Sequence, residues 1–171
     1  MEILVASSPA ADLSAFSFWW SLAITPVDAA LRLSAALACG LVLGVDREWR
    51  QRPAGLRTHM LVALAACLFT IIAFEIYAEI RALEDNAAAD PLRLLEAITA
   101  GVAFLAAGTI IRRGGGIEGL TTGAGLWLSG ALGMACGREQ FGLAAIALIL
   151  AVLVLTVLRI CERWFPSDGE N

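Results

Sequence analysis

Long apolar segments separated by arginine clusters constrain this chain more than any other feature of its sequence. Five runs of 17–19 mostly apolar residues occupy 27–45, 59–77, 94–111, 120–136 and 141–158. At about 1.5 Å of rise per residue, a helix of this length is close to the hydrocarbon thickness of a bilayer. Only 16% of the residues are charged, against about 25% in soluble domains. The sequence therefore predicts an all-α fold, a polytopic membrane bundle of about five transmembrane helices.

The arginines indicate how such a bundle is oriented. Eight of the 12 basic residues lie in three places, at 46–57, at 112–119 and after 158. Short loops rich in basic residues stay on the cytoplasmic side of a membrane. Five spans place all three segments on one side, and the loops at 78–93 and 138–139 on the other. We therefore expect a multi-pass protein with its N-terminus outside and its C-terminus in the cytoplasm.

The chain divides into three parts. Residues 1–26 are expected to form an N-terminal interfacial segment, since the aromatic stretch Phe16–Trp20 suits the headgroup region. This part begins with Glu2 and has no basic n-region, which argues against a cleaved signal peptide. Residues 27–158 form the transmembrane domain, and 159–171 a short cytoplasmic tail.

Small residues at helical spacing predict where the helices pack. In membranes, small side chains let helix backbones approach closely. The fifth apolar run has mostly large aliphatic side chains and is expected to be peripheral and to face lipid. The expected packing positions are Gly40, Gly44, Gly101, Gly108, Gly125, Ser129 and Gly133.

Two glycine-rich connections resemble each other. Gly44 precedes Gly55 by eleven residues, Gly108 precedes Gly119 by eleven residues, and each second glycine begins a Gly-Leu-x-Thr sequence. The offset of 64 residues would relate the first two spans to the next two as parallel repeats, an arrangement known in membrane proteins. Chance similarity of two glycine-rich loops is the alternative.

The two connections also supply the candidate site. Pro53 and Gly55 interrupt any continuous helix in the first of them. This segment either serves only as a topology anchor or meets the second connection in a site at the cytoplasmic mouth. Two carboxylates among four guanidiniums favour an anion, a lipid headgroup or an acidic protein surface over Mg²⁺. The candidate residues are Asp46, Arg47, Glu48, Arg57, Thr58, His59, Arg112, Thr121 and Thr122.

Few other residues could carry chemistry. Arg32, Glu75 and Glu96 are ionisable groups expected at membrane depth. Either a contact between Arg32 and one of the glutamates or snorkelling to the outer interface, which suits Glu96 better than Arg32, would lower the cost of burial. The four cysteines form no CxxC pair and are interpreted as small apolar side chains. Motifs of serine hydrolases, zinc proteases and phosphate loops are absent. We therefore expect no enzyme activity, no catalytic residue, no metal site, no cofactor and no nucleic-acid partner.

Three ordered blocks resemble the MgtC/SapB family of bacterial membrane proteins. They are DREWR with PAGLRTH at 46–59, the segment 90–108, and GLTT followed by LW at 119–127. The chain departs from the family pattern at Ala103 and Ala106, where glycines are usual, and at Glu118, where a basic residue is frequent. Many members carry a soluble C-terminal domain, so the resemblance covers the transmembrane domain only.

The function of the protein is indicated by the family resemblance and not by the composition. It implies a bacterial inner-membrane protein linked to growth in low Mg²⁺ and, in pathogens, to survival inside host cells and virulence. Such members are regarded as non-enzymatic regulators of membrane energetics that bind another membrane complex, the proton-translocating ATP synthase. The alternative is a transporter or channel for Mg²⁺ or another small solute. The expected partners are the lipid bilayer and a second membrane complex, with homo-oligomers left open.

Overall fold

The computed structural model of this chain describes residues 24–83, 90–113 and 116–164. This part of the chain forms five helices and a β-hairpin, so the predicted all-α bundle is confirmed. The expected interfacial segment around Phe16–Trp20 and the tail from 165 onward lie outside the described residues. The elements are α2 (Pro26–Trp49), α3 (Leu56–Leu83), α4 (Pro91–Ala107), β1 (Ile111–Arg113), β2 (Gly116–Glu118), α5 (Leu120–Gly137) and α6 (Phe141–Trp164).

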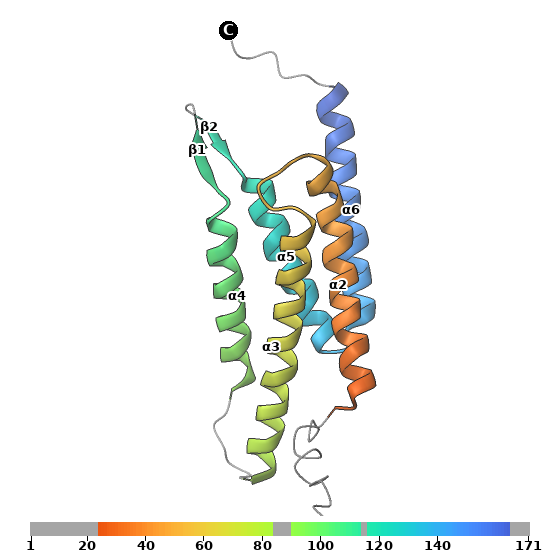
Figure 1. The fold of residues 1–171 in the computed structure, drawn as a ribbon, viewed down its shortest axis with the longest axis vertical. Coiled ribbons are helices and arrows are strands. Elements are labelled where there is room, and N and C mark those ends of the chain that lie inside the picture. The colour runs from red at the N-terminus through yellow and green to blue at the C-terminus, as the bar shows by residue number, and fades with distance from the viewer. Residues whose placement is uncertain (1–23, 84–89, 114–115, 165–171) are drawn as a thin grey trace, which may run out of the picture.

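Consecutive helices run in opposite directions along the long axis (Figure 1). The α2–α3 connection, the β-hairpin and the C-terminal end of α6 lie at one end of the bundle, whereas the α3–α4 and α5–α6 connections lie at the other. We call the first the arginine-rich end, comprising residues 46–58, 111–113 and 116–122, and the second the opposite end. The arginine-bearing connections therefore share one end, as the distribution of arginines in the sequence indicates.

Side-chain caps and prolines fix where two of the helices begin. The Thr25 hydroxyl accepts a hydrogen bond from the backbone N–H of Asp28 at 3.2 Å, and Asp90 accepts one from Leu92 at 2.9 Å. A proline follows each capping residue. Proline suits the first helical position because its missing N–H would have no partner there. The sequence thus marks these two starts with ordinary capping chemistry.

The third apolar run ends differently from the prediction. It was expected to continue to residue 111, but α4 ends at Ala107, and Ile111–Arg113 pairs with Gly116–Glu118 as an antiparallel hairpin. The backbone N–H groups of Thr109 and Ile110 turn back to carbonyls three residues earlier, and Thr109 also donates its hydroxyl to Ala106 at 2.7 Å. Gly108 and the β-branched residues after it favour this termination, because they lower helix propensity.

Helices α2, α3 and α5 form the centre of the bundle, where glycines bring backbones together. A Cβ atom built on Gly40 would lie 2.7 Å from the His59 carbonyl oxygen, and one on Gly44 would lie 2.7 Å from the Leu56 Cα. These contacts join α2 to the first turns of α3. The predicted GxxxG step therefore lies at a helix–helix interface.

Two of the predicted packing glycines, Gly101 and Gly108, do not lie at a contact between helices. A Cβ on Gly101 would meet no atom of the described chain within 4 Å, and one on Gly108 would approach only carbonyls of its own helix end. Instead, α4 meets α5 where Gly130 faces the Val102 side chain, at 2.9 Å from a built Cβ. Spacing alone identifies small residues, but which face of α4 meets a neighbour depends on the rotation of the helix.

Large apolar side chains cover the periphery of the bundle. Leu143, Ile146, Ile149 and Leu150 on α6 are each exposed, as expected for a lipid-facing helix. By length and composition, α2 and residues Leu56–Ala82 of α3 can cross a membrane, and α6 contains the shorter apolar segment Phe141–Val157. These features are those of a membrane protein.

The proposed internal repeat stays a prediction. Leu56 and Leu120 both begin helices directly after a glycine, and both helices run away from the arginine-rich end. The connections before them differ, because the first is a loop and the second is a β-hairpin. A superposition that places Gly55 on Gly119 would decide between duplication and chance.

Candidate functional site at the arginine-rich end

The two connections meet at the arginine-rich end around a pocket of about 320 Å³. One side comes from the end of α2 and the loop after it, and the other from β2 and the first turn of α5. The connections therefore lie together, as expected for a joint site. The lining residues are Arg47, Arg52, Pro53, Ile117, Glu118, Gly119, Leu120, Thr121 and Thr122.

Arg47 supplies the buried cation of this pocket. It lies in the last turn of α2, and only 6% of the residue is exposed. Within the described residues its guanidinium has neither an ion pair nor a hydrogen bond. A buried guanidinium is costly without a counter-charge, although the carbonyl end of α2 offsets part of this cost. Arg47 therefore places a strong donor group with free hydrogen-bonding capacity against the pocket.

The neighbouring carboxylates, Asp46 and Glu48, contact groups other than Arg47. Asp46 pairs with Arg50 one turn along α2, with Oδ1 and Nε 3.0 Å apart. Glu48 accepts a hydrogen bond from the backbone N–H of Leu56 at 2.9 Å and so caps α3. The Asp46–Arg50 pair is partly exposed and adds little stability, and Asp46 therefore acts on Arg47 only at longer range.

The first turn of α5 presents unpaired backbone donors to the same pocket. Gly119 precedes the helix with φ +92°, and no side chain caps it. A Cβ on Gly119 would lie 2.0 Å from the Thr109 carbonyl oxygen, so glycine is required by both space and backbone conformation. The first N–H groups of a helix have no intrahelical partner and carry a partial positive charge. Thr121 and Thr122 add hydroxyl groups beside them.

His59 lies buried between the three central helices. It is fully buried, and its Nδ1 lies 2.9 Å from the Gly55 carbonyl oxygen, to which it donates in the neutral form. Its Nε2 has no hydrogen-bond partner among the described residues and faces Gly125, where a built Cβ would lie 3.1 Å away. His59 therefore holds the start of α3 and does not line the pocket.

Besides Asp46, Glu48 and His59, three further predicted site residues lie outside the pocket. Arg57 and Thr58 are exposed in the first turn of α3, and Arg112 is exposed on β1. The pocket instead contains Arg52 and Glu118, which the sequence reasoning did not select. Arg52 could have been predicted because it belongs to the same arginine cluster, at 46–57, as Arg47. For Glu118 the only signal was its departure from the usual family residue.

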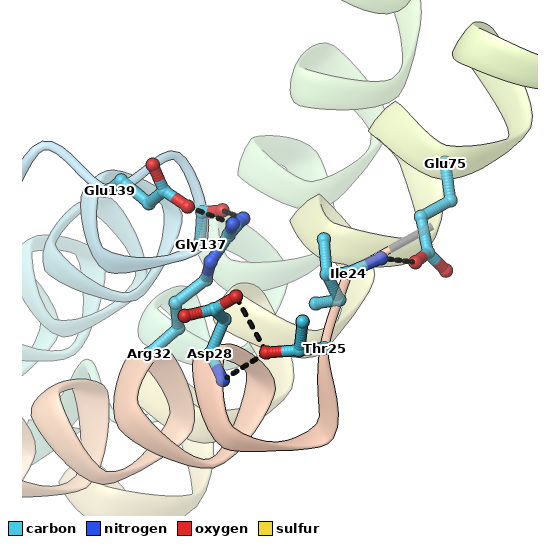
Figure 2. A network of polar contacts seen from close by, with 7 residues as sticks. All are labelled: Ile24, Thr25, Asp28, Arg32, Glu75, Gly137 and Glu139. Atoms are coloured by element: carbon cyan, nitrogen blue, oxygen red, sulfur yellow. Dashed lines mark hydrogen bonds and ion pairs between the residues drawn. The ribbon is translucent and has the colours of Figure 1, made fainter. Parts of the chain in front are cut away.

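A second network of polar contacts lies at the opposite end and joins residues that are far apart in the sequence (Figure 2). Arg32 donates from Nη1 to the Gly137 carbonyl oxygen at 3.0 Å and forms an ion pair with Glu139. Glu75 accepts a hydrogen bond from the backbone N–H of Ile24 at 3.3 Å. The expected contact of Arg32 with Glu75 or Glu96 is replaced by the contact with Glu139, because the α5–α6 turn lies over Arg32.

The remaining candidate groups are dispersed. Glu96 is exposed on α4. Cys39, Cys67 and Cys136 are free thiols in the apolar core, one on each central helix. Within residues 24–83, 90–113 and 116–164, no three His, Cys, Asp or Glu side chains gather in a group that could hold a metal ion. The polar chemistry of the described chain is thus concentrated at the two ends of the bundle.

The fold and these two polar ends define a helical membrane protein with glycine-packed central helices. The sequence profile of the MgtC family matches residues 33–164, and the chain belongs to this family. It is 41% identical to the protein MgtC of Salmonella typhimurium over 146 residues, which are 82% of this chain and 59% of that protein. No solved structure matches the chain.

Two further relatives have a similar extent of identity. Escherichia coli K12 has a protein named "Putative magnesium transporter YhiD", 38% identical over 72% of this chain and 56% of that protein. An uncharacterized protein of Synechocystis is 39% identical over 75% of this chain and 51% of its own length. The matched region therefore spans between half and three-fifths of these relatives.

Proposed function

We propose that the protein is a multi-pass regulator of the bacterial inner membrane that acts by binding another membrane complex and catalyses no reaction. Its five helices span the membrane with the N-terminus outside, because the arginine-rich end belongs on the cytoplasmic side. The setting is growth in low Mg²⁺ and, in pathogens, survival inside host cells, as the family resemblance implies.

The observation that carries this proposal is the exposed basic surface at the arginine-rich end. Arg52, Arg57 and Arg112 are all exposed there, and none forms an ion pair within the described residues. Guanidiniums offer planar, bidentate donors to carboxylates. Complementary charge steers association and fixes the orientation of partners. The surface therefore suits an acidic region of a partner complex.

The positions of the buried arginines favour regulation over cation transport. Arg32 lies near one end of α2 and Arg47 near the other, and both guanidiniums are largely buried. A divalent cation that moved along α2 would be repelled at one end by the guanidinium of Arg47, which has no ion pair in the described chain, and would meet the Arg32–Glu139 pair at the other. Between these ends the glycine contacts bring the central helices together at backbone distance.

The first experiment measures association. The tagged protein is purified from bacterial membranes in mild detergent, and retained ATP synthase, the candidate partner that the resemblance implies, is quantified by immunoblot. We expect wild type and Arg93→Ala to retain the complex and Arg57→Ala to lose most of it, since both arginines are exposed but lie at different ends. Equal retention by Arg57→Ala would contradict docking through this surface.

The second experiment addresses magnesium transport, which the name of Escherichia coli YhiD suggests for that protein. The purified protein is placed in liposomes that contain a Mg²⁺-sensitive dye. We expect Mg²⁺ to enter no faster than into protein-free liposomes. Saturable entry that depends on the protein would overturn the regulatory proposal in favour of a transporter.

A further inference from the structure

The pocket at the arginine-rich end contains more positive than negative side chains. Arg47 is more than nine-tenths buried, and its guanidinium forms no ion pair or hydrogen bond within the described chain, although the neighbouring Asp46 carboxylate attracts it at longer range. Asp46, the nearest acid in sequence, is paired with Arg50, and Glu48 is used by the α3 N-terminus. Burial of a guanidinium that is only partly compensated is costly, and an anion in the pocket would lower that cost.

The opposite wall supplies donors of a second kind. The α5 helix has 18 residues and begins without a side-chain cap. By contrast, α2, α3 and α4 each receive a carboxylate or hydroxyl at their first turn. Leu120, Thr121 and Thr122 line the same pocket as Arg47, and their backbone N–H groups donate no hydrogen bond within the described chain, as is usual for a first helical turn. A guanidinium opposite a helix N-terminus is an arrangement that fits a phosphate group.

The rim of the pocket has mixed charge. Arg52 lines it and is exposed, and Glu118 lines it from β2 and is also exposed. With Arg47, the pocket therefore carries two cationic side chains and one carboxylate, in addition to the helix N-terminus. The carboxylate opposes an incoming anion, so its removal should strengthen anion binding. The direction of this change in affinity distinguishes an anion site from a cation site, because in a cation site Glu118 would be a ligand and its removal would weaken binding.

We infer that this pocket binds a phosphate group, held by Arg47, Arg52 and the first turn of α5. The volume of about 320 Å³ admits a phosphate with part of the molecule that carries it. The pocket lies at the ends of α2 and α5, so a phospholipid headgroup and free phosphate are the two candidate sources of the phosphate group. The inference is separate from the proposed function, because phosphate binding by the purified protein requires no partner complex.

The test uses the full chain purified in a phosphate-free sugar detergent. Inorganic phosphate is titrated in one arm and short-chain phosphatidylglycerol in the other, with diacylglycerol of the same chain length as the lipid control. Binding is measured by calorimetry and by broadening of the ³¹P resonance. Saturable binding of phosphate identifies free phosphate as a source. Binding of phosphatidylglycerol but not diacylglycerol identifies the headgroup. Either result supports the site.

Variants connect the binding to the pocket. We expect Arg47→Gln and Arg52→Gln each to weaken binding about tenfold, since each removes a charge-assisted interaction. Glu118→Gln should bind severalfold more tightly. Arg93→Gln carries the same charge change on an exposed residue outside the pocket and should bind like wild type.

Arg52 is exposed, so its variant reports on the site even if Arg47→Gln fails to fold. The inference is overturned if neither probe binds saturably. It is also overturned if Arg52→Gln binds like wild type, if Arg93→Gln weakens binding equally, or if Glu118→Gln reduces binding. Loss of ATP synthase association with phosphate binding intact would refute only the proposed function.

Discussion

Gly133 of α5 lies so close to Ala63 of α3 that a Cβ atom on the glycine would be 2.2 Å from the Ala63 carbonyl oxygen. The obstructing atom belongs to the backbone of a neighbouring helix, so it cannot move without moving α3. Helix association in membranes depends on such close approach, because there is little hydrophobic driving force between helices in lipid. This contact therefore sets the separation of the two helices that make much of the central interface.

Gly133→Ala should destabilise the bundle because the methyl group forces α3 and α5 apart. Overpacking of this kind typically costs about 1–3 kcal/mol, and a backbone obstruction belongs at the upper end. Gly101→Ala is the matched control: no described atom lies within 4 Å of its built Cβ, and alanine favours the helix by up to about 1 kcal/mol. The stability of both variants is measured from the helical circular dichroism signal that remains as mild detergent is replaced by dodecyl sulfate. Equal stability of the two variants would contradict the interface.

Glu48 and Gly55 should be energetically coupled. A Cβ on Gly55 would lie 1.9 Å from Glu48 Oε2, the atom that caps Leu56. Glu48→Ala should therefore cost about 1 kcal/mol of unfolding free energy, as the loss of a cap does. Gly55→Ala should cost a similar amount by displacing the carboxylate, and much less when Glu48 is already alanine. A double-mutant cycle measures this coupling, and strictly additive effects would show that the cap contributes nothing.

Arg32 should matter more for stability than its ion-pair partner. Arg32→Gln leaves the Gly137 carbonyl oxygen without its donor and should cost about 1–3 kcal/mol. Glu139→Gln should cost about 1 kcal/mol or less, because the Glu139 side chain is 57% exposed. The same dodecyl sulfate titration compares the two variants. A larger loss for Glu139→Gln would mean that the ion pair, and not the backbone contact, fixes the α5–α6 turn.

Hydropathy was sufficient to predict the number and order of the helices in the described chain, because the apolar runs match helix lengths. Arg47, Thr121 and Thr122 were also predicted at the junction of the two connections. The contact of Arg32 with Glu139 was not predicted, since it joins residues 107 positions apart. The exposure of Arg57 was likewise not predictable, because the rotation of α3 depends on contacts of α2 and α5 with the buried His59.

Reporter fusions should place the arginine-rich end in the cytoplasm. Fusions after Gln51 and at the C-terminus should give a cytoplasmic signal, and a fusion after Asp85 should give an external one, because basic loops resist translocation. Paired alkaline phosphatase and fluorescent reporters provide opposite signals at each position and therefore control for expression. An external location after Gln51 would invert the topology and place the exposed arginines away from any cytoplasmic partner.

Arg57 should be needed for function although it is not needed for folding. It is exposed in the first turn of α3, and its side chain has no ion pair among the described residues. In bacteria that depend on this protein for growth in low Mg²⁺, Arg57→Ala should abolish growth while immunoblots show normal amounts in the membrane. Arg57→Lys should restore growth only in part, because an ammonium group keeps the charge but lacks the bidentate geometry of guanidinium. Full growth of Arg57→Ala at normal protein levels would remove this arginine from the docking surface, whereas complete rescue by Arg57→Lys would mean that charge alone is recognised.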